Sequence, residues 1–162
     1  SMGGLLTSRF AQQHPTDVAG IGLLGAVVGD WTWAREALAA PELPPATTDF
    51  SGMSRDADAV ERYATDPLIY RGAYKRPLLE AEMEALDAFQ ANVDQLTMPV
   101  LFCHGGDDPF VDHRTSLAAV ESMPSADKTI RLYEGARHEL VNETNRDVVI
   151  DEIAAFVRRL AT

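Results

Sequence analysis

Residues 98–108 read Met98-Pro-Val-Leu-Phe-Cys-His-Gly-Gly-Asp-Asp108, an apolar run that ends in two glycines and two acids. Apolar residues without polar alternation, as in Val100–Cys103, are typical of a strand covered on both faces of a parallel sheet. The two glycines predict a tight turn where this strand ends. Ligands of open parallel sheets bind at the carboxyl ends of the strands, so Asp108 is a functional candidate.

The chain after Asp108 predicts a second strand-loop unit of the same kind. We expect a helix over Thr115–Met123, an alternating strand over Thr129–Tyr133, a loop over Gly135–Glu139 and a final amphipathic helix over Asn145–Leu160. The expected apolar face of that last helix comprises Val148, Val149, Ile153, Phe156, Val157 and Leu160. His138 lies just past its strand, as Asp108 does, so the two side chains can meet as general base and orienting carboxylate. Each residue taken alone also has a non-catalytic interpretation: Asp108 as a turn residue and His138 as a solvent-exposed loop histidine.

The chain begins Ser1-Met-Gly-Gly4 and continues with apolar residues at helical spacing up to Gln13. This start matches the second half of a nucleophile elbow, Gly-x-Ser-x-Gly, which presents a serine hydroxyl where a strand turns into a helix. Gly3 would let the helix backbone pass close to its neighbours, and the Met2 N–H would be one oxyanion donor at the helix N-terminus. Ser1-Met2 has a second reading as the remnant of a cleaved tag. A buried strand is expected next, over Val18–Leu24.

The middle of the chain has a different character, with prolines and no strand-like run between Asp30 and Asn92. Helices are expected over Trp31–Ala40, Asp56–Tyr63 and Leu78–Val93. We therefore divide the chain into an elbow helix and core strand (1–29), a helical cap insertion (30–95) and a C-terminal core with the acid and histidine loops (96–162). Ser1, Asp108 and His138 then follow one another in the chain order of α/β-hydrolase triads.

The sequence resembles the monoacylglycerol lipase and lysophospholipase group of α/β-hydrolases over nearly its whole length. The resemblance rests on four segments in order: Ser1–Leu6, Tyr63–Tyr70, Met98–Asp108 and Tyr133–Glu139. In that group the acid is the third residue after the strand-end glycine, which carries over to Asp108 and not to Asp107. The resemblance implies a mostly parallel sheet with helices on both faces and a helical cap. It also implies a cofactor-free serine hydrolase that cleaves lipid carboxylic esters, monoacylglycerols above all, through an acyl-enzyme on Ser1.

Two features depart from the family pattern. The family's strands before the elbow, and the loop that gives the second oxyanion donor, are absent, so we expect an N-terminal part to be missing and these 162 residues alone to be inactive. The segment between Val28 and Phe50 is shorter than the usual lid, which predicts a preference for short or medium acyl chains. Trp31, Trp33 and Leu38 are candidates for lining the acyl-chain site, with plain core packing as the alternative.

Composition excludes several partners. The net charge is −11 and basic residues occur at most in pairs, so a nucleic-acid partner is not expected. Cys103 is the only cysteine, and the cluster of Asp107, Asp108, Asp112 and His113 offers too few oxygen ligands in register for calcium, so no metal is expected. No run approaches the roughly 20 apolar residues of a membrane span. We expect a cytoplasmic protein whose cap touches a membrane surface at most transiently.

Other functions fit the same residues. A general carboxylesterase, a lysophospholipase or an acyltransferase would use the same three side chains. A non-catalytic binding module on the same scaffold is the alternative from a different class. An intact set of Ser1, Asp108 and His138 argues against it.

Overall fold

The computed structural model describes residues 1–161, which contain a three-stranded parallel sheet. The strands are β1 (Ile21–Leu24), β2 (Val100–Gly105) and β3 (Lys128–Tyr133), in the spatial order β1-β2-β3. Leu24 pairs with Cys103, which pairs with Arg131 on the other side. Because all three strands run the same way, the loops that follow them emerge at one edge of the sheet.

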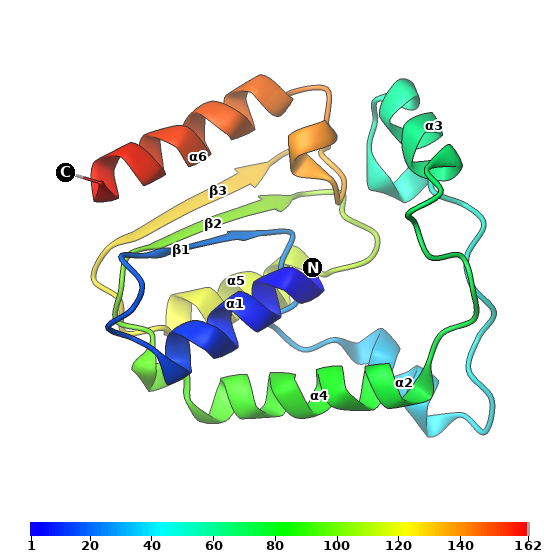
Figure 1. Cartoon of the computed structure of the whole chain (residues 1–162), viewed down its shortest axis with the longest axis horizontal. Helices are drawn as coiled ribbons and strands as arrows, with labels where there is room; N and C mark the ends of the chain where they lie inside the picture. Colours follow the sequence, from blue (N-terminus) through cyan, green and yellow to red (C-terminus); the bar gives the residue numbers. More distant parts are fainter. Residues whose placement is uncertain (162) are drawn as a thin grey trace.

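Helices cover both faces of this sheet, as expected for an α/β fold. The helices of the described residues are α1 (Met2–Gln13), α2 (Thr32–Ala39), α3 (Ala57–Thr65), α4 (Arg76–Ala91), α5 (His113–Ser122) and α6 (Arg146–Leu160), with 3-10 turns η1 (Ser51–Met53), η2 (Val93–Gln95) and η3 (Leu140–Asn142). In Figure 1, α6 lies on one face and α1 and α5 lie on the other, with α4 beyond them. The predicted α/β class is confirmed.

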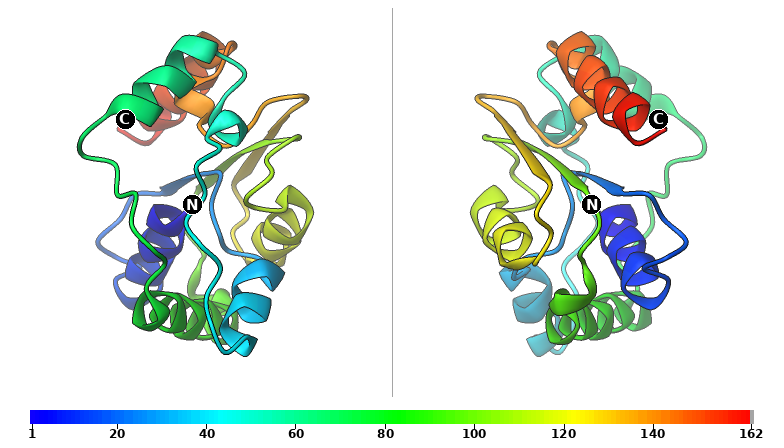
Figure 2. Two further views of the ribbon diagram at one scale, coloured as in Figure 1. Left: turned by 90° about the vertical axis from the view of Figure 1, so that its right-hand side faces the viewer. Right: turned by 90° about the vertical axis from the view of Figure 1, so that its left-hand side faces the viewer.

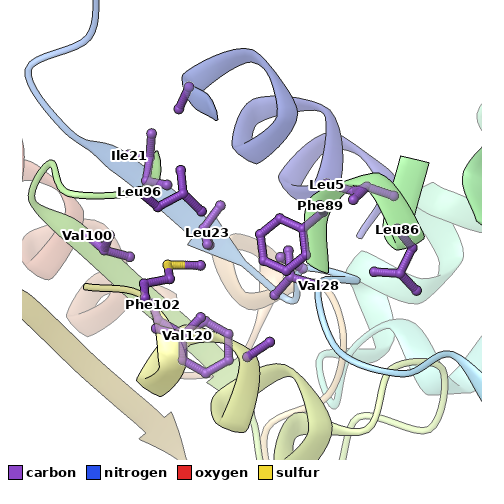
Figure 3. Close-up of a cluster of buried hydrophobic side chains, with 14 of the residues drawn as sticks. Leu5, Ile21, Leu23, Val28, Leu86, Phe89, Leu96, Val100, Phe102 and Val120 are labelled. Atoms are coloured by element: carbon purple, nitrogen blue, oxygen red, sulfur yellow. The ribbon is translucent and has the colours of Figure 1, made fainter. Parts of the chain in front are cut away.

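Strand β2 is the centre of the core, and all six of its residues are buried. Its side chains alternate between the faces of the sheet, as in any strand. Val100 and Phe102 belong to the larger apolar cluster, which α1, α4 and α5 complete (Figure 3). Leu101 and Cys103 belong to a smaller cluster under α6. The continuous apolar run of the sequence thus supplies two cores at once, and the prediction of a doubly covered strand is confirmed for β2.

The stretch predicted as a cap divides into two parts. Helix α4 begins with a proline in its first turn, where no intrahelical donor is lost, and buries Leu79, Met83, Leu86 and Phe89 in the larger core. Helix α3 is capped by the Asp56 carboxylate, which accepts hydrogen bonds from two N–H groups of its first turn. Figures 1 and 2 show α3 beyond the sheet edge, beside η3 and the start of α6. The assignment of residues 30–95 to a cap domain stays a prediction.

Three expectations about the elements were wrong in part. Strand β1 begins only at Ile21, and Gly22 is exposed, because β1 is an edge of the described sheet and is not covered on both faces. Strand β3 lies at the other edge and lacks the predicted alternation of burial. Helix α6 buries Val149 and Phe156, whereas Val148 and Val157 are 56% and 57% exposed. In Figure 1, α6 stands by itself on its face of the sheet, so a narrower stripe of it is covered.

Candidate active site

Asp108 lies in the turn after β2 and is held from two sides. Its Oδ1 atom accepts hydrogen bonds from the N–H groups of Phe110 (2.9 Å) and Val111 (3.1 Å), and its Oδ2 atom lies 2.8 Å from Nδ1 of His138. The side chain is fully buried, which by itself would raise the carboxyl pKa. The hydrogen bond and charge of His138, together with the two N–H groups, outweigh burial and hold the pKa of Asp108 below its ordinary value. The group is therefore a carboxylate near neutral pH.

His138 lies in the loop after β3, where Gly135 has a φ of +71° that favours glycine. The ring of Phe110 packs edge-on against the imidazole at 5.5 Å between centroids. Gly25, also with positive φ, lies beside His138, and a Cβ there would stand 3.2 Å from the His138 carbonyl oxygen and 3.4 Å from Nδ1. Because Nδ1 faces Asp108, Nε2 is the nitrogen left to exchange a proton.

Ser1 precedes α1 at the same edge of the sheet. Its side chain makes no capping hydrogen bond to the helix, and its carbonyl oxygen accepts a hydrogen bond from the N–H of Val27 at 3.3 Å. Val27 follows β1 in the loop that contains Gly25, so one short segment touches both Ser1 and His138.

The first turn of α1 leaves backbone N–H groups without an acceptor inside the helix. Met2 is the first helical residue, so its N–H has no acceptor within the helix. The close backbone approach predicted at Gly3 occurs one residue later: nothing lies within 4 Å of a Cβ built at Gly3, whereas one at Gly4 would stand 2.3 Å from Cβ of Ala26. A side chain at Gly3, the elbow glycine of the motif, would thus meet none of the described residues, whereas Gly4 packs against the loop after β1.

A second histidine lies close to Asp108. His104 is completely buried at the end of β2, with Nδ1 3.8 Å from Oδ2 of Asp108 and 3.2 Å from the carbonyl oxygen of Gly105. Burial lowers the pKa of His104, so its ring is neutral at neutral pH. Asp107, in contrast, is exposed. The acid thus faces two imidazoles, of which only that of His138 lies within hydrogen-bond distance.

An aromatic cavity of about 290 Å³ opens beside these residues. It is lined by Trp31, Trp33, Thr47, Tyr74, Pro109 and Phe110. Trp31 also lines a small cavity of about 50 Å³ that includes Ser1 and Glu82, so it separates Ser1 from the aromatic cavity. Its indole N–H donates to the Phe110 carbonyl at 3.2 Å, which fixes the ring. Trp31 and Leu38 both pack against the larger core, and Leu38, the third predicted lining residue, does not line the aromatic cavity.

Sequence reasoning missed several residues of this region. The ring of Tyr74 packs against that of Trp33 in a tilted arrangement, with 5.0 Å between centroids, and Phe110 joins the aromatic cavity to His138. Phe110 could have been suggested by its place two residues after Asp108, but nothing in the sequence pattern points to Tyr74. Within residues 1–161, no group of three or more His, Cys, Asp or Glu side chains is arranged to hold a metal ion.

The family profile described as "Serine aminopeptidase, S33" matches residues 1–145 of this chain. The chain belongs to this family of α/β-hydrolases. Over 97% of its length it is 25% identical to a monoacylglycerol lipase of Mycolicibacterium smegmatis and 30% identical to a monoglyceride lipase of Rattus norvegicus. It spans 59% and 56% of the length of these two relatives.

The fold of this family member matches solved lipases. It superimposes on 66% of a monoacylglycerol lipase from Paleococcus ferrophilus with a TM-score of 0.83 at 23% identity. It covers 63% of a monoglyceride lipase from Saccharomyces cerevisiae with a TM-score of 0.81 at 21% identity. These matches confirm the predicted α/β-hydrolase fold and the resemblance to the monoacylglycerol lipase group. Among residues 1–161, no helix is long and apolar enough to cross a membrane.

Proposed function

We propose that the protein containing this chain hydrolyses lipid carboxylic esters, monoacylglycerols above all, with Ser1, Asp108 and His138 as its catalytic triad. The observation that carries the proposal is the 2.8 Å contact between Asp108 and His138 at the sheet edge where Ser1 precedes α1. The aromatic cavity next to Ser1 supports an apolar acyl group in the substrate. The names of the relatives from Mycolicibacterium smegmatis and Rattus norvegicus support the same choice.

The proposed reaction is acyl transfer in two steps. The Ser1 hydroxyl oxygen attacks the ester carbonyl while Nε2 of His138 takes its proton, and the Met2 N–H stabilises the oxyanion. The C–O bond to the alcohol then breaks, and His138 returns the proton to the leaving oxygen. Water repeats the sequence on the acyl-enzyme and releases the carboxylic acid. Asp108 holds the imidazole with its Nδ1 proton toward the carboxylate throughout.

Labelling with a fluorophosphonate probe tests the proposal. In the full-length protein, the probe should attach to Ser1, as located by peptide mapping, and Ser1→Ala should abolish both labelling and hydrolysis of monoacylglycerols. The Asp107→Asn variant is a suitable control, because this acid is exposed and one residue from the proposed triad. A folded protein that neither reacts with the probe nor turns over esters would identify the chain as part of a binding module.

A lysophospholipid is a second candidate substrate. A relative from Bacillus subtilis named "Phospholipase YtpA" is 30% identical over 96% of this chain. A cavity of about 370 Å³ is lined by Arg62, which could bind a phosphate, but Asp66 and Glu139 line it as well. These two carboxylates disfavour an anionic headgroup, so we expect neutral glycerol esters to give the higher kcat/KM at equal acyl length. A higher kcat/KM for the lysophospholipid would make it the preferred candidate substrate.

A further inference from the structure

A buried carboxylate outside the proposed triad joins the histidine loop to the segment around η1. The side chain of Glu143 has no solvent exposure. Its Oε1 atom accepts from the backbone N–H groups of Arg137 (2.8 Å) and Arg55 (3.0 Å), and its Oε2 atom accepts from Nε of Arg55 (2.9 Å) and the N–H of Thr144 (2.8 Å). Burying a carboxylate costs free energy of desolvation unless hydrogen bonds such as these compensate for it. A buried carboxylate with this many partners indicates a specific structural or functional role.

The groups that Glu143 joins come from two distant parts of the chain. Arg137 immediately precedes His138, whereas Arg55 follows η1 and precedes α3. The same two segments are linked again by hydrogen bonds from the N–H of Glu139 to the carbonyl of Met53 (2.7 Å) and from Oγ of Ser54 to the carbonyl of Asn142 (2.8 Å). The backbone that carries His138 is therefore fixed on both sides of the histidine by the segment that leads into α3.

Glu143 carries its charge in this position. Burial would raise its pKa, but the N–H groups of Arg137 and Thr144 and the contacts with Arg55 outweigh burial and lower the pKa. Arg55 also donates to Oδ1 of Asn145 at 3.0 Å, which holds its guanidinium in place. A glutamine at position 143 would keep an oxygen for one pair of donors and turn its NH₂ group toward the other pair.

We propose that Glu143 is a positioning residue that, together with Arg55, locks the His138 loop onto the segment before α3 and thereby sets the contact between His138 and Asp108. The inference rests on the proposed hydrolase function, because it concerns the same histidine. Glu143 does not touch the reacting atoms in this arrangement and acts through the N–H of Arg137. A shift of the segment before α3 would therefore change the position of His138, the proposed catalytic base, through these hydrogen bonds.

The test compares Glu143→Gln with Glu134→Gln in the full-length protein. Glu134 lies in the same loop and is exposed, so its variant removes an equal charge without removing these hydrogen bonds. Rates are expressed per active site, counted with the fluorophosphonate probe, so that unfolded molecules do not contribute. Glu143→Gln should lower kcat about 10- to 100-fold, the range expected when a catalytic group is displaced by about 1 Å. Its KM should change little, and Glu134→Gln should behave as the wild type does.

A spectroscopic measurement separates positioning from simple loss of stability. The proton between His138 and Asp108 should give a downfield NMR signal that moves or broadens in Glu143→Gln and is unchanged in Glu134→Gln. If Glu143→Gln does not fold, Arg55→Gln, which keeps the backbone N–H bonds to Glu143, should show smaller changes of the same kind. An unchanged kcat per site and an unchanged signal in a folded variant would overturn the inference. Failure of the wild-type protein to react with the probe would count against the proposed function instead.

Discussion

Asp107 and Asp108 are neighbours of identical chemistry in opposite surroundings. Asp107 is exposed, whereas Asp108 is buried and bonded to two N–H groups and His138. The register of the glycine turn, Gly105-Gly106, decides which of them faces the histidine. The resemblance to the monoacylglycerol lipase group predicted this register, and in the structure Asp108 and not Asp107 contacts His138.

The two acids should therefore respond differently to loss of charge. In the full-length protein, Asp108→Asn should lower kcat by about four orders of magnitude, as expected when the acid of a triad becomes neutral and the imidazole loses its preferred tautomer. Asp107→Asn should have little effect. Steady-state hydrolysis of a nitrophenyl ester measures both. A larger loss for Asp107→Asn would show that the register is wrong by one.

The lowered pKa of Glu143 predicts how stability depends on pH. Because its folded-state pKa lies below the unfolded value of about 4.3, the unfolded chain binds more protons near that value, and stability falls as the pH drops through this window. The stabilisation that ionised Glu143 contributes is fully present above this pH window. Urea unfolding of the full-length protein at a series of pH values should show this loss, and Glu143→Gln should show less of it. If the free energy of unfolding depended on pH equally in both proteins, Glu143 would not be the source of this pH dependence.

Residues whose roles depend on distant segments could not be predicted from the sequence. His138 and Asp108 follow strand ends, so their neighbourhood was predictable from a local pattern. Glu143 has equally local chemistry, but its partner Arg55 lies in another part of the chain, and no periodic pattern links the two. Tyr74 likewise meets Trp33 only because α2 and α4 lie side by side in the fold.

At the scale of elements, the sequence predicted well which segments are helices and which are strands. It predicted less well which faces of these elements are covered. The apolar residues of α6 and the run before Ile21 were assigned to buried positions. Coverage of Val148, Val157 and Gly22 depends on how many layers lie on each face of the sheet and on which strand is at its edge. Neither property is encoded in the periodicity of one segment.

The short segment between Val28 and Phe50 predicts a limit on acyl length. The aromatic cavity that we propose for the acyl chain is lined in part by Trp33 and Tyr74. Each buried methylene contributes about 0.8 kcal/mol, so four methylenes left in water would forgo roughly 3 kcal/mol of discrimination. We expect kcat/KM to rise up to a medium chain length and then to level off. Monoacylglycerols of graded length, kept below their critical micelle concentrations, provide the measurement. A continuing rise into long chains would refute the short-cap argument.

At the scale of the whole molecule, the described sheet has an open edge. Strand β1 pairs with β2 on one side, and an apolar groove of about 350 Å³ runs beside it, lined in part by Gly22, Phe156 and Leu160. Leu6 and Phe10 of α1 are 55% and 50% exposed. Unpaired strand edges and exposed apolar side chains of this kind favour association with other chains.

We therefore expect the 162-residue polypeptide by itself neither to unfold cooperatively nor to hydrolyse esters. The full-length protein measured in parallel is the control. Calorimetry and an esterase assay on material whose mass establishes that it starts at Ser1 would test this. A single sharp thermal transition accompanied by turnover would contradict it.

Trp31 lines both the small cavity at Ser1 and the larger aromatic cavity. Its indole is fixed by the hydrogen bond to Phe110, so we expect it to narrow the space beside the ester carbonyl in the proposed reaction. Esters branched at the carbon next to the carbonyl should therefore have a lower kcat/KM than their straight-chain isomers. Trp31→Ala would join the two spaces, and the ratio of kcat/KM for a branched ester to that for its straight isomer should increase. This one indole would then discriminate between acyl shapes independently of acyl length.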